Sequence, residues 1–71
     1  GKIERADVML FALEAADLNL SPEAAALIHS ESKGIFRRVH NCVLSVESAA
    51  RVAGLRDVSA DLVKQTLGIR R

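Results

Sequence analysis

The sequence has no tryptophan or tyrosine, and it has only one cysteine, one proline and one methionine among 71 residues. The single cysteine, Cys42, excludes an internal disulfide and any metal site built from several cysteines. No apolar run approaches the ~18 residues of a membrane-spanning helix, and no secretory signal pattern is present. We therefore expect a cytoplasmic protein with no membrane partner.

Sequence patterns for catalysis are also lacking. There is no glycine-rich phosphate loop ending in Lys-Ser or Lys-Thr, so the chain is not expected to hydrolyse a nucleotide alone. His29 and His40 fall on different predicted helices without a third ligand at metal-binding spacing, and the carboxylates are scattered singly. Cys42 belongs to an apolar stripe, which favours a core residue over a nucleophile. We predict no enzyme activity, metal or cofactor for this chain by itself.

The residues that are present indicate one small helical domain. Of the residues, 49% are hydrophobic and 27% charged, and alanine, leucine and valine dominate the apolar set. A core of this size is marginal, because a domain of about 60 residues buries only about 60% of its unfolded surface. The chain also begins with Gly1 and Lys2 rather than methionine. We therefore interpret residues 1–71 as a single domain from the C-terminal part of a longer protein, with Gly1 left by cloning.

Apolar residues recur at helical spacing in four segments, which predicts an all-α, compact four-helix bundle. The expected helices span about residues 4–16, 22–32, 35–53 and 60–67. The first carries apolar residues on more than one face and is expected to be buried on two sides. No strand is predicted, although residues 56–58 are compatible with a locally extended backbone. Residues 68–71 are expected to fray.

Capping residues support these bounds. Ser21, Pro22 and Glu23 form a strong start signal for the second helix. Lys33 and Gly34 supply the cation and the left-handed residue that are common at a helix end. Ser59 is a good N-cap for the fourth helix.

The third helix has the most regular apolar stripe and is expected to be central. On its outer side, Glu47 and Arg51 have the spacing of a favourable ion pair within one helix. The stripe consists of Ile35, Val39, Cys42, Val43, Val46, Ala49, Ala50 and Ala53.

Two arginines, Arg37 and Arg38, occupy the first turn of this third helix. Cations are disfavoured there, because the helix dipole is positive at its N-terminus. One interpretation is that a phosphate approaches the helix end and is held by guanidinium groups and backbone N–H donors. The other is an ordinary solvated face, with an arginine paired to Glu31. The residues alone leave both interpretations open.

The second half of the chain is more basic than the first, although the net charge is only +1. Clustered cations neutralise nucleic-acid phosphates, so this half contains candidates for DNA contact. Three features argue against nucleic-acid binding: the small net charge, the scarcity of aromatic residues for stacking single strands, and the lack of a recognition helix rich in base-reading Asn, Gln and Arg. An ordinary solvated surface is the alternative for each residue. The DNA candidates are Arg38, Arg56, Lys64, Arg70 and Arg71.

The order of these elements resembles the C-terminal helical lid of AAA+ ATPases. The similarity is closest to the phage Mu B branch of DNA transposition helpers and the related ATPases of general secretion, and it covers about residues 3–67. It is carried by four short motifs: Arg5-Ala6-Asp7-Val8, Gly34-Ile35-Phe36-Arg37, Val39-His40-Asn41 and Asp57-Val58-Ser59.

The resemblance implies that Arg37 is the sensor-2 arginine, which reaches the phosphates of ATP bound with Mg on a separate N-terminal ATPase core. Many lids have proline or alanine before that arginine, whereas this chain has Phe36. The parent protein would be an ATPase of a phage or mobile element. It would bind double-stranded DNA without strong sequence preference, assemble on it as a homo-oligomer and deliver it to the transposase.

Two other functions remain open. One is the lid of a secretion-type or replication-type AAA+ ATPase without a DNA role. The other is a free-standing helical module for protein interaction.

Overall fold

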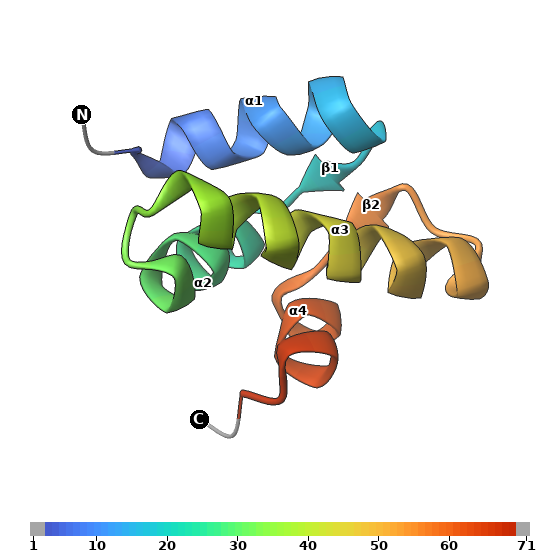
Figure 1. Cartoon of the computed structure of the whole chain (residues 1–71). Coiled ribbons are helices and arrows are strands. Elements are labelled where there is room, and N and C mark those ends of the chain that lie inside the picture. The colour runs from blue at the N-terminus through green and yellow to red at the C-terminus, as the bar shows by residue number, and fades with distance from the viewer. Residues whose placement is uncertain (1–2, 70–71) are drawn as a thin grey trace.

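The structure is a computed structural model that describes residues 3–69, and these residues confirm the all-α prediction. The helix bounds agree with the predicted ones to within one residue. The helices that begin at Arg5 and Phe36 each start one residue later than predicted, because the preceding residues are extended N-caps. Figure 1 shows the four helices of the described part: α1 (Arg5–Ala16), α2 (Pro22–Ser32), α3 (Phe36–Ala53) and α4 (Ala60–Leu67).

A short parallel pairing of two strands joins distant parts of the chain. Strand β1 (Asn19–Leu20) lies beside β2 (Asp57–Val58), with Asn19 opposite Asp57 and Leu20 opposite Val58. The absence of strands was therefore predicted wrongly, because two residues are too few for a period-two pattern to be visible. The extended backbone near Asp57 was anticipated, but its partner was not. The pairing connects the segment after α1 to the segment before α4 (Figure 1).

Helix α2 lies at the centre and contacts α1, α3 and α4. Its inner residues Ala24, Ala25 and Ile28 are fully buried. Two alanines among them allow neighbouring helices to approach closely, because there is little side chain to separate the backbones. Helix α3 also contacts the three other helices, so the central place predicted for it is shared with α2.

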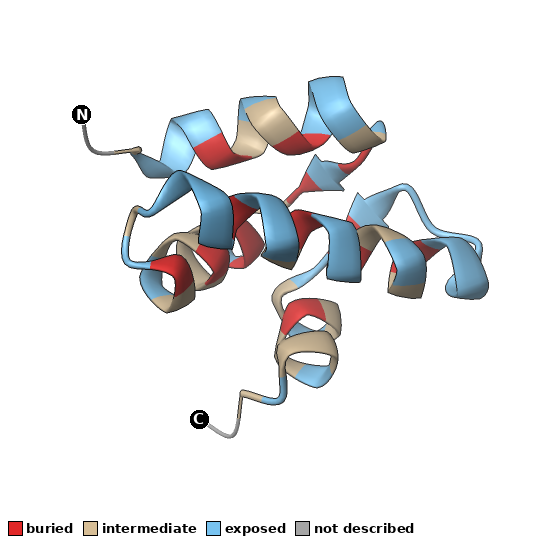
Figure 2. Ribbon diagram, viewed as in Figure 1, coloured by how far each residue is buried: buried red, intermediate tan, exposed pale blue. Residues whose placement is uncertain are grey.

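The predicted apolar stripe of α3 forms most of its buried face. Val39, Val43, Val46 and Ala50 are buried, and they form the red inner face of this helix in Figure 2. The two ends of the stripe, Ile35 and Ala53, are exposed instead. Ile35 is the N-cap residue and Ala53 the last residue of α3, so both lie at the ends of this 18-residue helix.

The ion pair predicted on the outer side of α3 is present. Arg51 Nη2 lies 3.0 Å from Glu47 Oε2.

The predicted two-sided burial of α1 is wrong. Its fully buried residues, Val8 and Ala12, lie on one side, while Leu10 and Leu13 are 54% and 45% exposed. The main contacts of α1 are with α2, α3 and β1, and they leave about half of the Leu10 and Leu13 side chains exposed.

Of the tail predicted to fray, residues 68–71, the structure describes Gly68 and Ile69, and both have defined contacts. Gly68 adopts a left-handed conformation that ends α4, and the Ile69 N–H donates to the Lys64 carbonyl oxygen at 2.9 Å. Ile69 also packs against the core. Arg70 and Arg71 lie outside the described residues.

Because Val46 is buried and Ser45 is exposed, an aspartate at each position should affect the free energy of unfolding very differently. Val46→Asp buries a lone carboxylate where the native side chain has no exposed surface. We expect it to cost about 3 kcal/mol or more, a large part of the roughly 4 to 10 kcal/mol typical of a domain of this size. Ser45→Asp, on the exposed side of α3, should change the free energy of unfolding little. Urea denaturation followed by circular dichroism compares the two, and equal stability would contradict the assignment.

Candidate functional site

A tight turn places the start of α3 beside the end of α2. Ser32 ends α2, and the next two residues, Lys33 and Gly34, have left-handed backbone angles with φ of 55° and 72°. The Ile35 N–H then donates to the Ser32 carbonyl oxygen at 3.0 Å. The left-handed glycine was predicted, whereas the left-handed Lys33 was not, because lysine adopts this conformation uncommonly.

The start of α3 differs from the other helix starts. The hydroxyl of Ser21 accepts a hydrogen bond from the Ala24 N–H at 3.0 Å in α2, and Ser59 does the same in α4. In α1, Asp7 Oδ2 accepts from the Glu4 N–H at 3.0 Å. The N-cap of α3 is Ile35, whose side chain cannot accept a hydrogen bond, and the first turn holds no acidic residue. The first N–H groups of α3 therefore have no side-chain acceptor in this cap and can donate to an external anion.

The guanidinium groups of Arg37 and Arg38 occupy this first turn and are exposed. Within residues 3–69, neither group takes part in an ion pair or a side-chain hydrogen bond. Successive residues of a helix are about 100° apart around its axis, so the two side chains leave α3 in different directions. Both are therefore available to a partner that approaches this end of α3.

Three aromatic rings meet beside the same helix end. The ring centroids of Phe11 and Phe36 are 5.4 Å apart in an edge-to-face arrangement, and the ring of His40 stacks on Phe36 at 6.4 Å with an interplanar angle of 9°. Phe36 is 57% exposed. This cluster was not predicted from the sequence. Its one visible signal was the spacing of four residues between Phe36 and His40, which places both on one side of a helix.

The DNA candidates that the structure describes, Arg38, Arg56 and Lys64, lie on different segments of the fold. Arg56 lies beyond the far end of α3 from Arg38, and this helix is about 27 Å long. Arg56 Nη2 is also paired with Asp17 Oδ1 at 2.8 Å. Lys64 lies on α4, where it lines a groove together with Glu23. The other two candidates, Arg70 and Arg71, fall outside the described residues.

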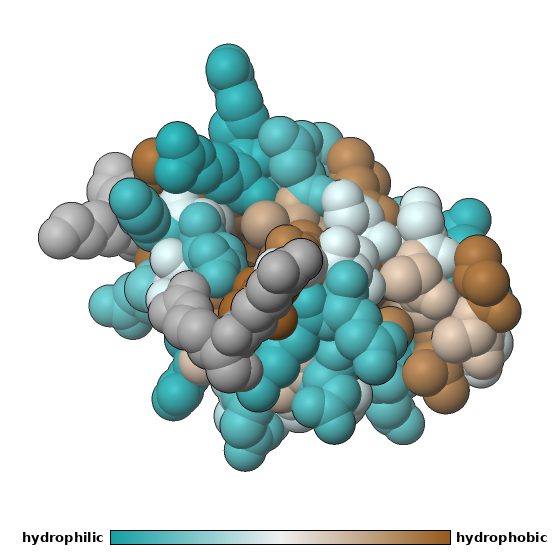
Figure 3. Space-filling view, turned by 90° about the horizontal axis from the view of Figure 1, so that it is seen from below, coloured by the Kyte–Doolittle hydropathy of each residue, from teal (hydrophilic) through white to brown (hydrophobic). Residues whose placement is uncertain are grey.

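Apolar side chains also reach the surface at the end of α3 opposite to Arg37 and Arg38. Val52 and Leu55, near the C-terminal end of α3, are 91% and 48% exposed. Figure 3 shows an apolar area at this end of the molecule, whereas much of the rest of that face is hydrophilic.

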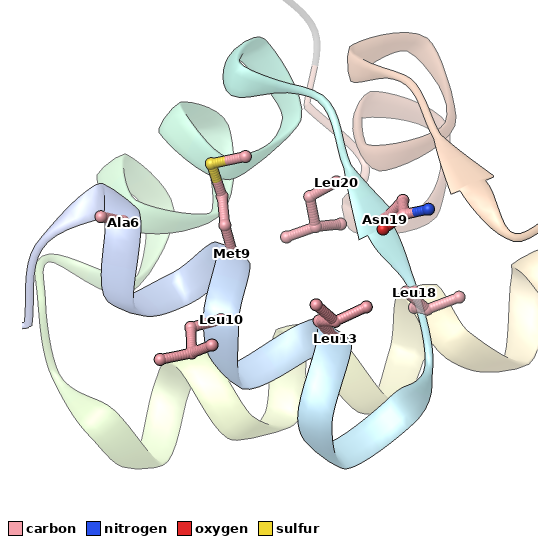
Figure 4. Close-up of a pocket in the computed structure, with 7 residues that line it drawn as sticks. All are labelled: Ala6, Met9, Leu10, Leu13, Leu18, Asn19 and Leu20. Atoms are coloured by element: carbon pink, nitrogen blue, oxygen red, sulfur yellow. The ribbon is translucent and has the colours of Figure 1, made fainter.

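A shallow groove between α1 and β1 has a volume of about 300 Å³, and Figure 4 shows the side chains that surround it. Its lining contains no titratable side chain, so it offers an apolar surface and no catalytic group. The lining residues are Ala6, Met9, Leu10, Leu13, Leu18, Asn19 and Leu20.

Two further features bear on chemistry. No group of three or more His, Cys, Asp or Glu side chains is placed to hold a metal ion within residues 3–69. In the same part of the chain, no helix has the length and apolar character needed to cross a membrane.

Comparison with known protein families, with curated proteins and with solved structures finds no match to this chain.

Cys42 is half-buried on α3. Burial raises the pKa of its thiol above the usual value, and the negative charge of Glu31 raises it further. The thiolate is the reactive form, so the folded chain should react slowly with iodoacetamide at pH 8, and unfolding in urea should speed the reaction several-fold. Mass spectrometry of the alkylated fraction measures both rates. Equal rates in the folded and unfolded chain would show that the thiol is neither shielded nor shifted.

Proposed function

We propose that this chain is the C-terminal helical lid of an AAA+ ATPase of the Mu B type, a DNA transposition helper. The observation that carries the proposal is the start of α3. It has no side-chain cap and no acidic residue, and it presents two exposed arginines where cations are normally disfavoured. A nearby phosphate removes this disadvantage, because it accepts hydrogen bonds from both the backbone N–H groups and the guanidinium groups.

The phosphate would belong to a nucleotide held by another domain, since the chain has no phosphate loop of its own. In this arrangement Arg37 faces the terminal phosphates of ATP. A positive charge placed there stabilises the negative charge that develops on the transferred phosphoryl group. The lid supplies no nucleophile and no base. Hydrolysis, with ATP and Mg, belongs to the ATPase core of the parent protein.

The resemblance of the motifs supports the larger context. The parent protein would assemble on double-stranded DNA as a homo-oligomer, bind it without strong sequence preference and present it to a transposase. The lid would respond to the bound nucleotide through Arg37 and so couple assembly to ATP.

One observation favours the second candidate, a lid that does not itself contact DNA, as in a secretion-type or replication-type ATPase. The described DNA candidates are dispersed, with Arg56 paired to Asp17 and Lys64 beside Glu23 in a groove. Non-specific DNA binding depends on several cations acting on one run of phosphates, which this spacing does not offer.

The role of Arg37 is testable in the full-length ATPase. Arg37→Ala should lower the rate of ATP hydrolysis at least about tenfold, because it removes a charge that faces the transferred phosphate. The matched control is Arg51→Ala on the same helix, where the side chain is 79% exposed and its pair with Glu47 should be worth less than about 1 kcal/mol. Unchanged hydrolysis in the Arg37 variant, with the control also unchanged, would exclude the sensor role.

Direct DNA contact is tested by titrating the 71-residue chain with duplex DNA and following its backbone amide shifts. We expect no salt-sensitive shifts at Arg56 and Lys64, since neither lies on a continuous basic surface. Shifts confined to Arg37 and Arg38 are compatible with a phosphate-binding helix end. Salt-sensitive shifts at all four residues would instead establish a DNA surface on the lid.

A further inference from the structure

We propose that His29 is a positioning residue, which holds the segment before α1 against the turn between α2 and α3. Its Nε2 atom lies 2.6 Å from the carbonyl oxygen of Ile3, a residue 26 positions earlier in the chain. A carbonyl oxygen only accepts hydrogen bonds, so Nε2 must carry the hydrogen in this contact. We refer to it as the Ile3–His29 contact.

The backbone of His29 is itself held in place. The hydroxyl of Ser32 donates to the His29 carbonyl oxygen at 3.1 Å, and Ser32 is fully buried. The histidine therefore projects from the last turn of a helix whose end is fixed by a buried side chain.

Gly34, in the turn between α2 and α3, also lies near the carbonyl oxygen of Ile3. A Cβ atom at this position would lie 3.4 Å from the Ile3 oxygen and 3.9 Å from His29 Nε2, and the φ of Gly34 is +72°. The left-handed backbone is what favours glycine here, because a Cβ atom at these distances would make only ordinary van der Waals contacts. The side chain of Ile3 also packs against the core. The Ile3 carbonyl is therefore approached by both the histidine ring and the turn.

The Ile3–His29 contact connects the segment before α1 to the turn that leads into α3. Gly34 is three positions before Arg37, so Ile3 is connected to the arginine-bearing start of α3 through one hydrogen bond and a tight turn. The functional consequence rests on the proposed function. If an ATPase core precedes this domain, the Ile3–His29 contact sets the position of Arg37 relative to that core.

Packing of the Ile3 side chain alone is the competing explanation for the order of this segment. Two variants of the 71-residue chain distinguish the effect of Ile3 packing from the effect of the hydrogen bond. His29→Phe keeps a ring of similar size but has no donor, whereas His29→Gln has an amide N–H₂ that can reach about as far as Nε2. His40→Gln is the matched control, because it alters the other histidine, on a different helix.

Nitrogen-15 relaxation of the backbone amides measures the result. We expect His29→Phe to raise the fast mobility of Ile3 and Glu4, while His29→Gln and His40→Gln leave it close to that of the native chain. A long-range nitrogen–proton correlation on the native chain should also show Nε2 of His29 protonated, and this readout does not depend on any variant folding.

Three results would overturn the proposal: an unprotonated Nε2 in the native chain, unchanged mobility in the phenylalanine variant, or a glutamine variant as mobile as the phenylalanine variant. None of them bears on the ATPase test of Arg37. Conversely, failure of the Arg37 test would leave the Ile3–His29 contact intact and would remove only its functional consequence.

Discussion

The packing of α3 against α2 is the interaction on which the other elements depend. Fully buried valines of α3, such as Val43 and Val46, face a helix whose own inner surface includes Ala24 and Ala25. Large side chains on one helix and small ones on the other allow a close approach without voids. Helices α2 and α3 each contact α1 and α4 as well, so this pair touches every other helix of the described chain.

The same pair determines where the candidate site lies. Two successive left-handed residues, Lys33 and Gly34, reverse the chain in a short space, so α3 begins directly after α2 ends. The N-cap residue before Phe36 is Ile35, whose side chain cannot accept a hydrogen bond, so α3 begins without a side-chain cap. The exposed arginines and the aromatic cluster are thus presented together at one end of the bundle. In the proposed function, an anion carried by another domain would approach this end of the bundle.

Sequence reasoning succeeded where the information is local. The caps at Ser21 and Ser59, the left-handed Gly34 and the ion pair within α3 each depend on residues a few positions apart, and the structure confirms them. It failed where distant residues meet. The pairing of β1 with β2, the one-sided burial of α1, the aromatic cluster and the contact of Ile3 with His29 require the tertiary arrangement. The positions of the cations in space could not be predicted for the same reason. A basic half of a sequence need not form a basic surface.

The pairing of β1 with β2 has a consequence for how the chain reaches this fold. Asn19 and Asp57, whose side chains are hydrogen-bonded at 3.2 Å, are 38 positions apart. Closing a loop of that size costs entropy that local helix formation does not, so the pairing raises the contact order of an otherwise helical domain. The first and last helices are thereby tied into one cooperative unit, and trimming either of them would weaken the whole bundle.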